Sequence, residues 1–377
     1  MAQLGITSWT YTGNDYYCPV DWDINRSRQD IDDFLRAENY RVIIPMRERR
    51  PVIKFLLKSI KGRIPPTNII IINDNSDSEV VRAARNIYPR VKIIDKEELL
   101  GVLDKQLLKF LMVSQSIPEG KGMAVLAGYL YVYLDSKITD RRINWLFQHD
   151  AEVRETNPFT NFDYLVWTLL NHQENVDHVK IAKTGRGNER SMSARSLLLT
   201  LINLPSNSPN NRIKVRAIDL FKKLAPLKWM LTGQFVLRYD LAVKRPFASG
   251  YLEETLLSAF VKDTNPSTTL QVANPYPCLD DNNNARKEDR MQQLISNFLF
   301  ALAYYVKPLS TWMIEDIREV NSKFMAVNLP MSFIPDNEQP VDIECVPNER
   351  IIPSITMLDN HGLIDWDKAK EVIEKYK

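Results

Sequence analysis

Cysteine and histidine are scarce in this sequence. Its 377 residues include three cysteines, Cys18, Cys278 and Cys345, and four histidines. The cysteines are odd in number and far apart, so neither a disulfide framework nor a cysteine-ligated metal site is indicated. This usage favours a reducing compartment, and we expect a cytoplasmic protein. The spacing of the histidines does not indicate a Ser-His-Asp or Cys-His catalytic arrangement.

Long apolar runs and an excess of one charge are also missing. The longest apolar stretch, 294–306, has about 13 residues, whereas a membrane-spanning helix needs ~20. The first residues lack the charged start and apolar core of a signal peptide. Basic residues number 49 and acidic residues 47, so the net charge is +2 and nucleic acid is not indicated as a partner. Because no apolar run reaches the length of a membrane-spanning helix, we expect no membrane span.

Apolar runs that alternate with helical periodicity begin near residue 39. Four runs predict buried strands, over 40–45, 68–72, 91–94 and 144–147. Helices are predicted between and after them, over 52–60, 80–87, 103–113 and 123–134. A continuous apolar strand such as Asn68–Ile72 is covered on both faces, as in a parallel sheet with helices on each side. The expected fold class is α/β, with a mostly parallel, Rossmann-like sheet and flanking helices.

The rest of the chain predicts three regions. Residues 1–38 form a polar, aromatic N-terminal extension, with a helix over 26–36. Residues 39–260 form the main α/β domain. Residues 261–377 form a helical C-terminal region and tail. Further helices are expected over 197–204, 218–224, 286–306 and 366–376, and another after Tyr251.

Polar side chains follow the predicted strands, where open α/β sheets bind ligands. Asp74 follows the second strand, and its carboxylate suits a nucleotide base or ribose, although short polar residues at 73–77 also suit a helix cap. Asp150 and Glu152 follow the strand 144–147. Two carboxylates two residues apart on an extended segment point the same way, so both can address one hard cation. The alternative is a solvated loop.

Three glycine-containing segments are further candidates. Gly120–Gly122 opens a helix, and its backbone amides with Lys121 suit a phosphate, although a plain turn has the same composition. The segment 183–190 combines glycines with cations, which suits an anionic acceptor or a basic surface loop. A turn at 232–234 is followed by Glu253 and Glu254 at a helix start, where carboxylates are favoured in any case.

Taken in order, these segments resemble the nucleotide-sugar glycosyltransferases of the GT-A fold. The range 42–53 (VIIPMRERRPVI) is similar to their opening strand, loop and helix, and 71–77 (IINDNSD) to their nucleotide-binding strand end. Asp150-Ala151-Glu152 looks like a variant of their Asp-x-Asp metal motif. Four further segments resemble glucosyl-3-phosphoglycerate and mannosyl-3-phosphoglycerate synthases: the Gly-Lys-Gly element, 187–199 (GNERSMSARSLLL), the turn 232–234 and 246–254 (PFASGYLEE). The resemblance covers residues 40–260.

The resemblance implies transfer of a hexose from a UDP- or GDP-hexose to a small phosphorylated acceptor, such as 3-phosphoglycerate, with Mg²⁺ or Mn²⁺. It implies that Asp150 and Glu152 hold the metal and that Glu254, with Asp150, is catalytic. It further implies donor contacts from Pro45, Arg47, Glu48, Asp74, Lys121 and Gly122, and acceptor contacts from Gly187, Arg190, Gly233 and Gln234. A homodimer stays open.

The sequence departs from that family at three points. Arg49 stands where the family has a glutamate, Gln234 replaces the glutamate of a Gly-Glu turn, and no histidine between His178 and His361 matches the family's late metal ligand. Two alternatives therefore remain. The same fold acts on a larger acceptor, such as a polysaccharide, a lipid head group or a modified nucleic-acid base. Otherwise the chain binds nucleotide sugars without turning them over.

Overall fold

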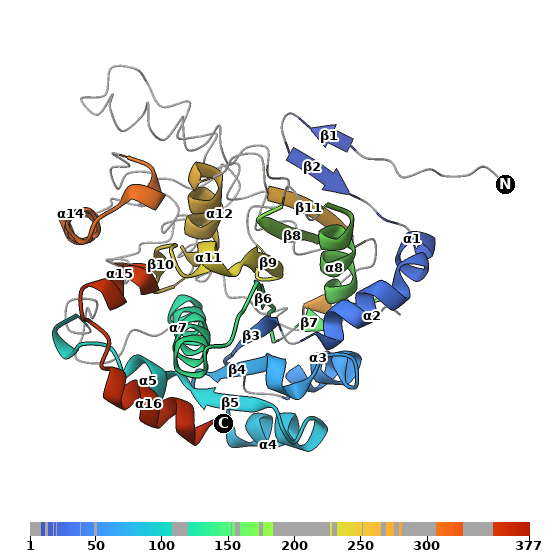
Figure 1. The fold of residues 1–377 in the computed structure, drawn as a ribbon, viewed down its shortest axis with the longest axis horizontal. Coiled ribbons are helices and arrows are strands. Elements are labelled where there is room, and N and C mark those ends of the chain that lie inside the picture. Colours follow the sequence, from blue (N-terminus) through green and yellow to red (C-terminus); the bar gives the residue numbers. More distant parts are fainter. Residues whose placement is uncertain are drawn as a thin grey trace, which may run out of the picture.

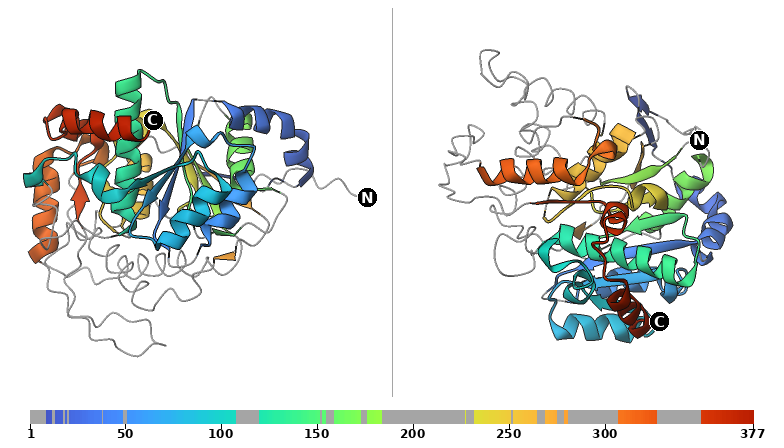
Figure 2. Two further views of the ribbon diagram at one scale, coloured as in Figure 1. Left: turned by 90° about the horizontal axis from the view of Figure 1, so that it is seen from below. Right: turned by 60° about the vertical axis from the view of Figure 1, so that its left-hand side comes forward.

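The structure is a computed structural model. It describes residues 9–11, 14–17, 19, 21–37, 39–48, 51–107, 120–151, 153–154, 159–172, 176–183, 227, 232–250, 252–264, 269–274, 279–280, 307–326 and 350–377. The three cysteines and the predicted helices over 197–204, 218–224 and 286–306 lie outside these residues, as does most of the helix predicted over 103–113. Figure 1 shows a central sheet with helices on both sides, and Figure 2 shows the same arrangement from two other directions.

The central sheet has nine described strands in the order β1-β2-β11-β8-β9-β6-β3-β4-β5. Their bounds are β1 Trp9–Tyr11, β2 Asn14–Tyr17, β3 Tyr40–Met46, β4 Ile69–Asn73, β5 Lys92–Asp95, β6 Trp145–Gln148, β8 His178–Lys183, β9 Phe235–Arg238 and β11 Thr269–Asn274. Strand β9 is antiparallel to both its neighbours, and β1 is antiparallel to β2. The other neighbouring pairs are parallel. The predicted α/β fold with a mostly parallel sheet is confirmed, and the four predicted strands lie within one residue of their expected bounds.

Both faces of the sheet are covered, as the continuous apolar strands predict. Along β3, Ile43 packs into one core cluster and Ile44 into the other. One cluster lies under α7 Lys121–Thr139, α12 Glu253–Thr264 and α16 Trp366–Lys375. The other lies under α2 Arg28–Arg36, α3 Ile53–Ile60, α4 Ser78–Ile87 and α8 Asn161–His172. Helix α7 is buried on nearly every side, so it is a core helix rather than an amphipathic surface helix.

The C-terminal region packs against the main domain. It comprises η3 Leu309–Thr311, α14 Ile314–Ala326, β13 Ile351–Ile352, α15 Ile355–Asn360 and α16. Strand β13 pairs antiparallel with β10 Phe247–Ala248, and α16 contacts both α7 and α5 Lys96–Leu100. The predicted helix over 366–376 is confirmed as α16. The remaining described elements are α1 Asp21–Arg26, η1 Pro66–Asn68, α11 Tyr239–Ala242, and the paired strands β7 Val153–Arg154 and β12 Leu279–Asp280.

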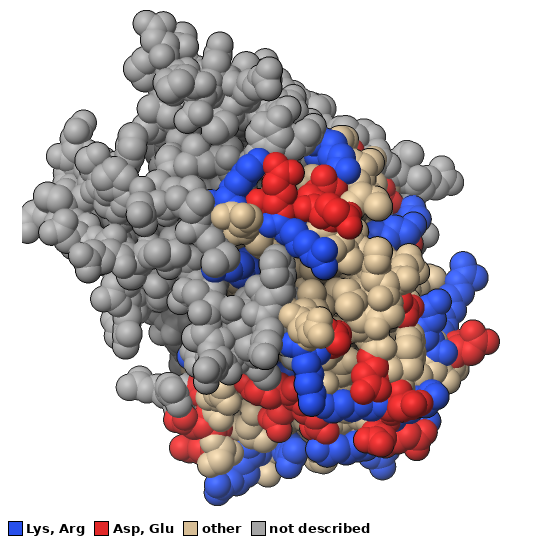
Figure 3. Space-filling view, turned by 90° about the vertical axis from the view of Figure 1, so that its left-hand side faces the viewer, with Lys and Arg blue, Asp and Glu red and all other residues tan. Residues whose placement is uncertain are grey.

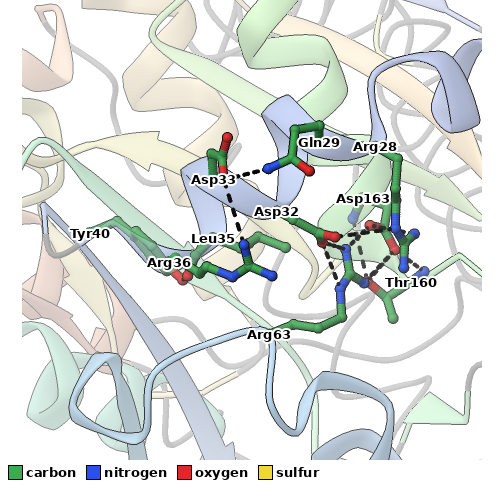
Figure 4. Close-up of polar contacts among 10 residues, drawn as sticks. All are labelled: Arg28, Gln29, Asp32, Asp33, Leu35, Arg36, Tyr40, Arg63, Thr160 and Asp163. Carbon is green, nitrogen blue, oxygen red and sulfur yellow. Dashed lines mark hydrogen bonds and ion pairs between the residues drawn. The ribbon is translucent and has the colours of Figure 1, made fainter.

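An ion-pair network attaches the N-terminal helix α2 to the domain (Figure 4). Arg63 lies between α3 and η1, and it donates to Asp32 of α2 and to Asp163 of α8 at 2.8 and 2.5 Å from its Nη2 atom. The Asp163 side chain is fully buried, and its Oδ2 also accepts from the backbone N–H of Thr160 at 2.6 Å. Strand β2 joins the main sheet beside β11. The boundaries at residues 38 and 260 stay predictions.

The helices and the surface charges are consistent with two features of the sequence, its short apolar runs and its balanced charge. In the described residues, no helix is both long enough and apolar enough to cross a bilayer. On the face shown in Figure 3, Lys and Arg side chains are interspersed with Asp and Glu over the residues that are described.

Candidate active site

The candidate site lies where β6 ends and β9 begins. Strands β3, β4, β6 and β8 are aligned, so their carboxyl ends share one edge of the sheet. Because β9 runs in the opposite direction, its first residue lies at this edge. Phe235 pairs with Gln148, which places the turn before β9 next to the residues after β6. This is the edge at which open α/β sheets bind ligands.

Four polar side chains meet at this edge and form what we term the lysine–carboxylate cluster: Lys121, Asp150, Gln234 and Glu254. Lys121 Nζ lies 2.6 Å from Asp150 Oδ1 and 2.7 Å from Glu254 Oε1. The amide Nε2 of Gln234 donates to Asp150 Oδ2 at 2.8 Å. The cluster thus brings together the Gly-Lys-Gly element, the residues after β6, the turn before β9 and the start of α12.

The cluster is half-open to solvent. The side chains of Lys121, Asp150 and Glu254 are 26, 14 and 12% exposed. Burial by itself lowers the pKa of Lys121, but the carboxylates of Asp150 and Glu254 outweigh it and hold that pKa above its usual value. Lys121 is therefore an ammonium ion at neutral pH. The Asp150 and Glu254 carboxylates therefore share one ammonium group.

Two glycines permit the close approach of the segments that form the cluster. A Cβ on residue 233 would lie 2.1 Å from Asp150 Oδ1. A Cβ on residue 122 would lie 1.8 Å from the carbonyl oxygen of Ala248 in β10. At position 122 a side chain would meet backbone atoms, whereas at position 233 it would displace the Asp150 carboxylate. Gly122 therefore sets the first turn of α7 directly against β10.

The predicted donor residues at the ends of β3 and β4 lie at the same edge of the sheet. Two of them, Asp74 and Glu48, are more buried than Lys121 and the carboxylates that it contacts. Asp74 is 2% exposed and forms a buried ion pair with Lys96 at the start of α5. Glu48 is 7% exposed, and its Oε2 accepts from the backbone N–H of Ile53 at the start of α3. Pro45 is half-buried within β3, and Arg47, which follows the strand, is exposed.

Three predicted site residues have no described position. Glu152, Gly187 and Arg190 lie outside the described residues. The second carboxylate of the predicted metal pair and the predicted acceptor loop therefore stay predictions from the sequence. Asp150, Lys121, Gln234, Gly233 and Glu254 are brought together.

Lys180 was not identified from the sequence, yet it lies close behind Glu254. It is 1% exposed on β8, and its Nζ donates to Ser258 Oγ at 2.7 Å. Ser258 Oγ in turn donates to the backbone oxygen of Glu254 at 2.9 Å. The alternation of HVKIAK, residues 178–183, was the available signal, since it places His178 and Lys180 on one face of a strand.

A sequence match over part of the chain and the fold both bear on the class of this protein. Residues 41–106 match the sequence profile of glycosyl transferase family 2. The whole described architecture is that of the GT-A fold. Together the match and the fold support a nucleotide-sugar glycosyltransferase. No curated protein matches the chain.

Solved structures of one enzyme have this fold. The chain is similar to glucosyl-3-phosphoglycerate synthase from Mycobacterium tuberculosis in complex with Mn²⁺ and UDP-glucose, with 16% identity over 78% of this chain and 88% of that chain and a TM-score of 0.55. The complex of that synthase with Mn²⁺, UDP and glucosyl-3-phosphoglycerate gives 17% identity, coverage of 75 and 85%, and a TM-score of 0.53. The complex with Mn²⁺, UDP-glucose and glycerol 3-phosphate gives 18% identity, coverage of 73 and 83%, and a TM-score of 0.52. At these identities the similarity establishes the fold.

Proposed function

We propose that this chain transfers a hexose from a nucleoside-diphosphate sugar to a small phosphorylated acceptor. The observation that carries the proposal is the lysine–carboxylate cluster at the carboxyl edge of a GT-A sheet. Lys121 holds Asp150 and Glu254 within 2.6 and 2.7 Å of one ammonium group. Three segments that are distant in sequence thereby provide a cation and two carboxylates at one point.

Mg²⁺ or Mn²⁺ fits the donor set of this cluster. Asp150 offers a partly exposed carboxylate, the kind of hard oxygen ligand that these ions prefer. Within the described residues, no three His, Cys, Asp or Glu side chains gather into a metal-binding group. Mg²⁺ is commonly held by one or two carboxylates together with substrate phosphates. We propose Asp150 and Glu152 as these ligands, and the bound ion would neutralise charge on the departing diphosphate.

The remaining cluster residues have separate proposed roles. We propose that Lys121 binds a phosphate or the sugar, since it is the first residue of α7 and carries a positive charge. Glu254, which contacts Lys121 at 2.7 Å, faces the same space and would stabilise positive charge that develops on the sugar. Gln234 orients Asp150, and we propose that the turn it shares with Gly233 borders the acceptor. Gly187 and Arg190 are proposed to contact the acceptor, and Asp74 the nucleoside.

The test is turnover of nucleotide sugars by the purified full chain. UDP-glucose, GDP-glucose, GDP-mannose and UDP-galactose are incubated with Mn²⁺, and release of the nucleoside diphosphate is followed with 3-phosphoglycerate, glycerol 3-phosphate or no acceptor. We expect one donor to be turned over with a phosphorylated acceptor, EDTA to abolish turnover, and added Mn²⁺ to restore it. Asp150→Asn should remove the activity while the far-UV circular dichroism stays unchanged. Absence of turnover for every donor and acceptor would refute the proposal.

A second candidate is a nucleotide-sugar-binding protein without turnover. It is favoured by the contacts of Asp150, since Lys121 engages one carboxylate oxygen and Gln234 engages the other. Both protein donors compete with a metal ion for the same two atoms. Calorimetric titration separates the candidates, because saturable binding of a nucleotide sugar with no release of nucleoside diphosphate would favour this second function.

A further inference from the structure

A fully buried ion pair lies behind the lysine–carboxylate cluster. Arg245, between α11 and β10, pairs with Glu253, the first residue of α12. The side chains of Arg245 and Glu253 are 0 and 3% exposed. The guanidinium carbon of Arg245 lies 4.7 Å from the ring centroid of Tyr129 in α7 and 4.1 Å from that of Phe247 in β10. One arginine therefore contacts α7, β10 and α12 at once.

Glu253 also fixes the backbone of β10. Its Oε2 accepts a hydrogen bond from the backbone N–H of Ala248 at 2.9 Å. The carbonyl oxygen of that same residue is the group against which Gly122 packs. Ala248 is thus held through its N–H by the first residue of α12, while its carbonyl touches the first turn of α7. Ala248 therefore contacts the starts of both helices.

The opposite edge of β10 is also held. Ala248 pairs with Ile351 and Phe247 with Ile352 of β13. The backbone N–H of Ile351 donates to Asn321 Oδ1 in α14 at 2.8 Å, and Asn321 Nδ2 donates back to the Ile351 oxygen at 2.7 Å. Strand β10 therefore has fixed contacts on both sides. Lys121 precedes Gly122, and Glu254 follows Glu253. Because Gly122 and Glu253 both contact Ala248 of β10, the position of β10 also affects the distance between Lys121 and Glu254.

We propose that the hydrogen bond from the Ala248 N–H to Glu253 Oε2, beside the Arg245–Glu253 pair, is a positioning contact for the reaction, which keeps Lys121 within reach of Glu254 by anchoring β10 between α7 and α12. This inference rests on the proposed function. The essential contact is the hydrogen bond from the Ala248 N–H to the side chain at position 253. The ion pair serves it by orienting the Glu253 carboxylate, and the Tyr129 and Phe247 rings hold the arginine.

The test uses two double variants, because removing one partner alone leaves a buried unpaired charge. Arg245→Met/Glu253→Gln removes both charges but keeps a side-chain oxygen that accepts from the Ala248 N–H. Arg245→Met/Glu253→Leu removes both charges and that oxygen. A matched control, Arg63→Met/Asp163→Asn, removes a buried ion pair on the other face of the sheet. All are assayed at a temperature at which circular dichroism shows them folded.

The two double variants are expected to differ in kcat. Displacement of a catalytic group by about 1 Å reduces the rate by up to about 100-fold. We expect Arg245→Met/Glu253→Leu to lose at least about tenfold in kcat with little change in the donor KM. Arg245→Met/Glu253→Gln should stay within about threefold of the unaltered chain, and the Arg63 control should too. Equal kcat values for the two position-253 variants would overturn the proposal.

A second measurement does not depend on activity. Amide hydrogen exchange of residues 120–126 and 247–254 should accelerate in the leucine variant and stay unchanged in the glutamine variant and in the control. If the unaltered chain turns over no donor, the proposed function fails, and exchange alone decides whether the pair anchors β10. Unchanged exchange in the leucine variant would overturn the anchoring itself.

Discussion

Gly233 and Asp150 occupy adjoining space, so a side chain at position 233 would displace the Asp150 carboxylate. A Cβ there would lie 2.1 and 2.3 Å from the two Asp150 oxygens, well inside van der Waals contact. The neighbouring Gln234 meanwhile donates to Oδ2 of the same carboxylate. The turn before β9 therefore determines where the carboxylate after β6 points. Loss of the glycine would displace Asp150 rather than unfold the sheet.

Gly233→Ala is expected to inactivate the protein while preserving its fold. Displacement of Asp150 by about 1 Å should reduce kcat for donor turnover about 100-fold. Steady-state kinetics with Mn²⁺ and the active donor measures the effect, and thermal unfolding controls for stability. Gly62→Ala is a suitable comparison, because a Cβ at that loop glycine meets no atom within 4 Å, although its φ of +82° will cost some stability. Normal turnover by Gly233→Ala would contradict the geometry described.

Lys121→Met should also impair turnover. Without the ammonium, the carboxylates of Asp150 and Glu254 lose the cation that both contact. Removal of a charged group that stabilises a transition state costs about 100- to 1000-fold in kcat, and we expect a loss of that order. Lys244→Met, at an exposed lysine after α11, is the matched control and should retain activity. A Lys121→Met protein as active as this control would exclude Lys121 from the site.

The stability of the protein should rise with pH between 8 and 9.5. Burial lowers the pKa of Lys262 to about 8, whereas the unfolded value is 10.5. Between these values the unfolded chain binds more protons than the folded chain, so raising the pH favours folding. Urea unfolding at several pH values gives the free energy of unfolding of Lys262→Met and of the unaltered chain. The increase of this free energy with pH should be smaller in the variant by up to about 1.4 kcal/mol per pH unit. Parallel pH dependences would show that Lys262 is not buried as described.

Asp163→Asn should destabilise the fold without affecting the site directly. It removes a fully buried carboxylate that Arg63 contacts at 2.5 Å, and it leaves the arginine charge partly unpaired (Figure 4). Breaking a buried pair from one side costs about 3–5 kcal/mol. Chemical unfolding measures the loss. Limited proteolysis should then cleave near α2 first, because that helix is attached through Asp32 to the same arginine.

Much of the first half of the fold follows from hydrophobic periodicity. The run Ile69–Ile72 is apolar at every position and buried on both faces, so its burial is visible without any tertiary information. Strand β8 was harder, because His178 and Lys180 interrupt its apolar pattern although both are buried. Their burial depends on α12, which lies far away in sequence. Periodicity alone does not reveal a polar layer covered by a distant helix.

Some residues of the candidate site could be identified from the local sequence, and others depend on contacts between distant segments. The Gly-Lys-Gly element and the residues after β6 could be identified locally, since each combines a strand or helix end with suitable side chains. Glu254 had an equally good local explanation as an acidic residue in the first turn of a helix. Its contact with Lys121 joins residues 133 positions apart. Arg245 and Glu253 were likewise ordinary in sequence, and their pairing exists only because α11, β10 and α12 fold back on one another.

The reversed direction of β9 brings the end of β8 and the start of β9 to the same edge of the sheet. Strand β8 ends at Lys183 and β9 begins at Phe235, and the two are hydrogen-bonded neighbours that meet at the edge next to Asp150. The chain therefore leaves this edge at the end of β8 and returns to it at the start of β9, the neighbouring strand. Lengthening a connection between fixed, adjacent ends costs little free energy, about 0.6 kcal/mol for each doubling. The free energy of the fold therefore sets little constraint on the length of the segment between these strands, which contains Gly187 and Arg190, the residues that we propose for the acceptor.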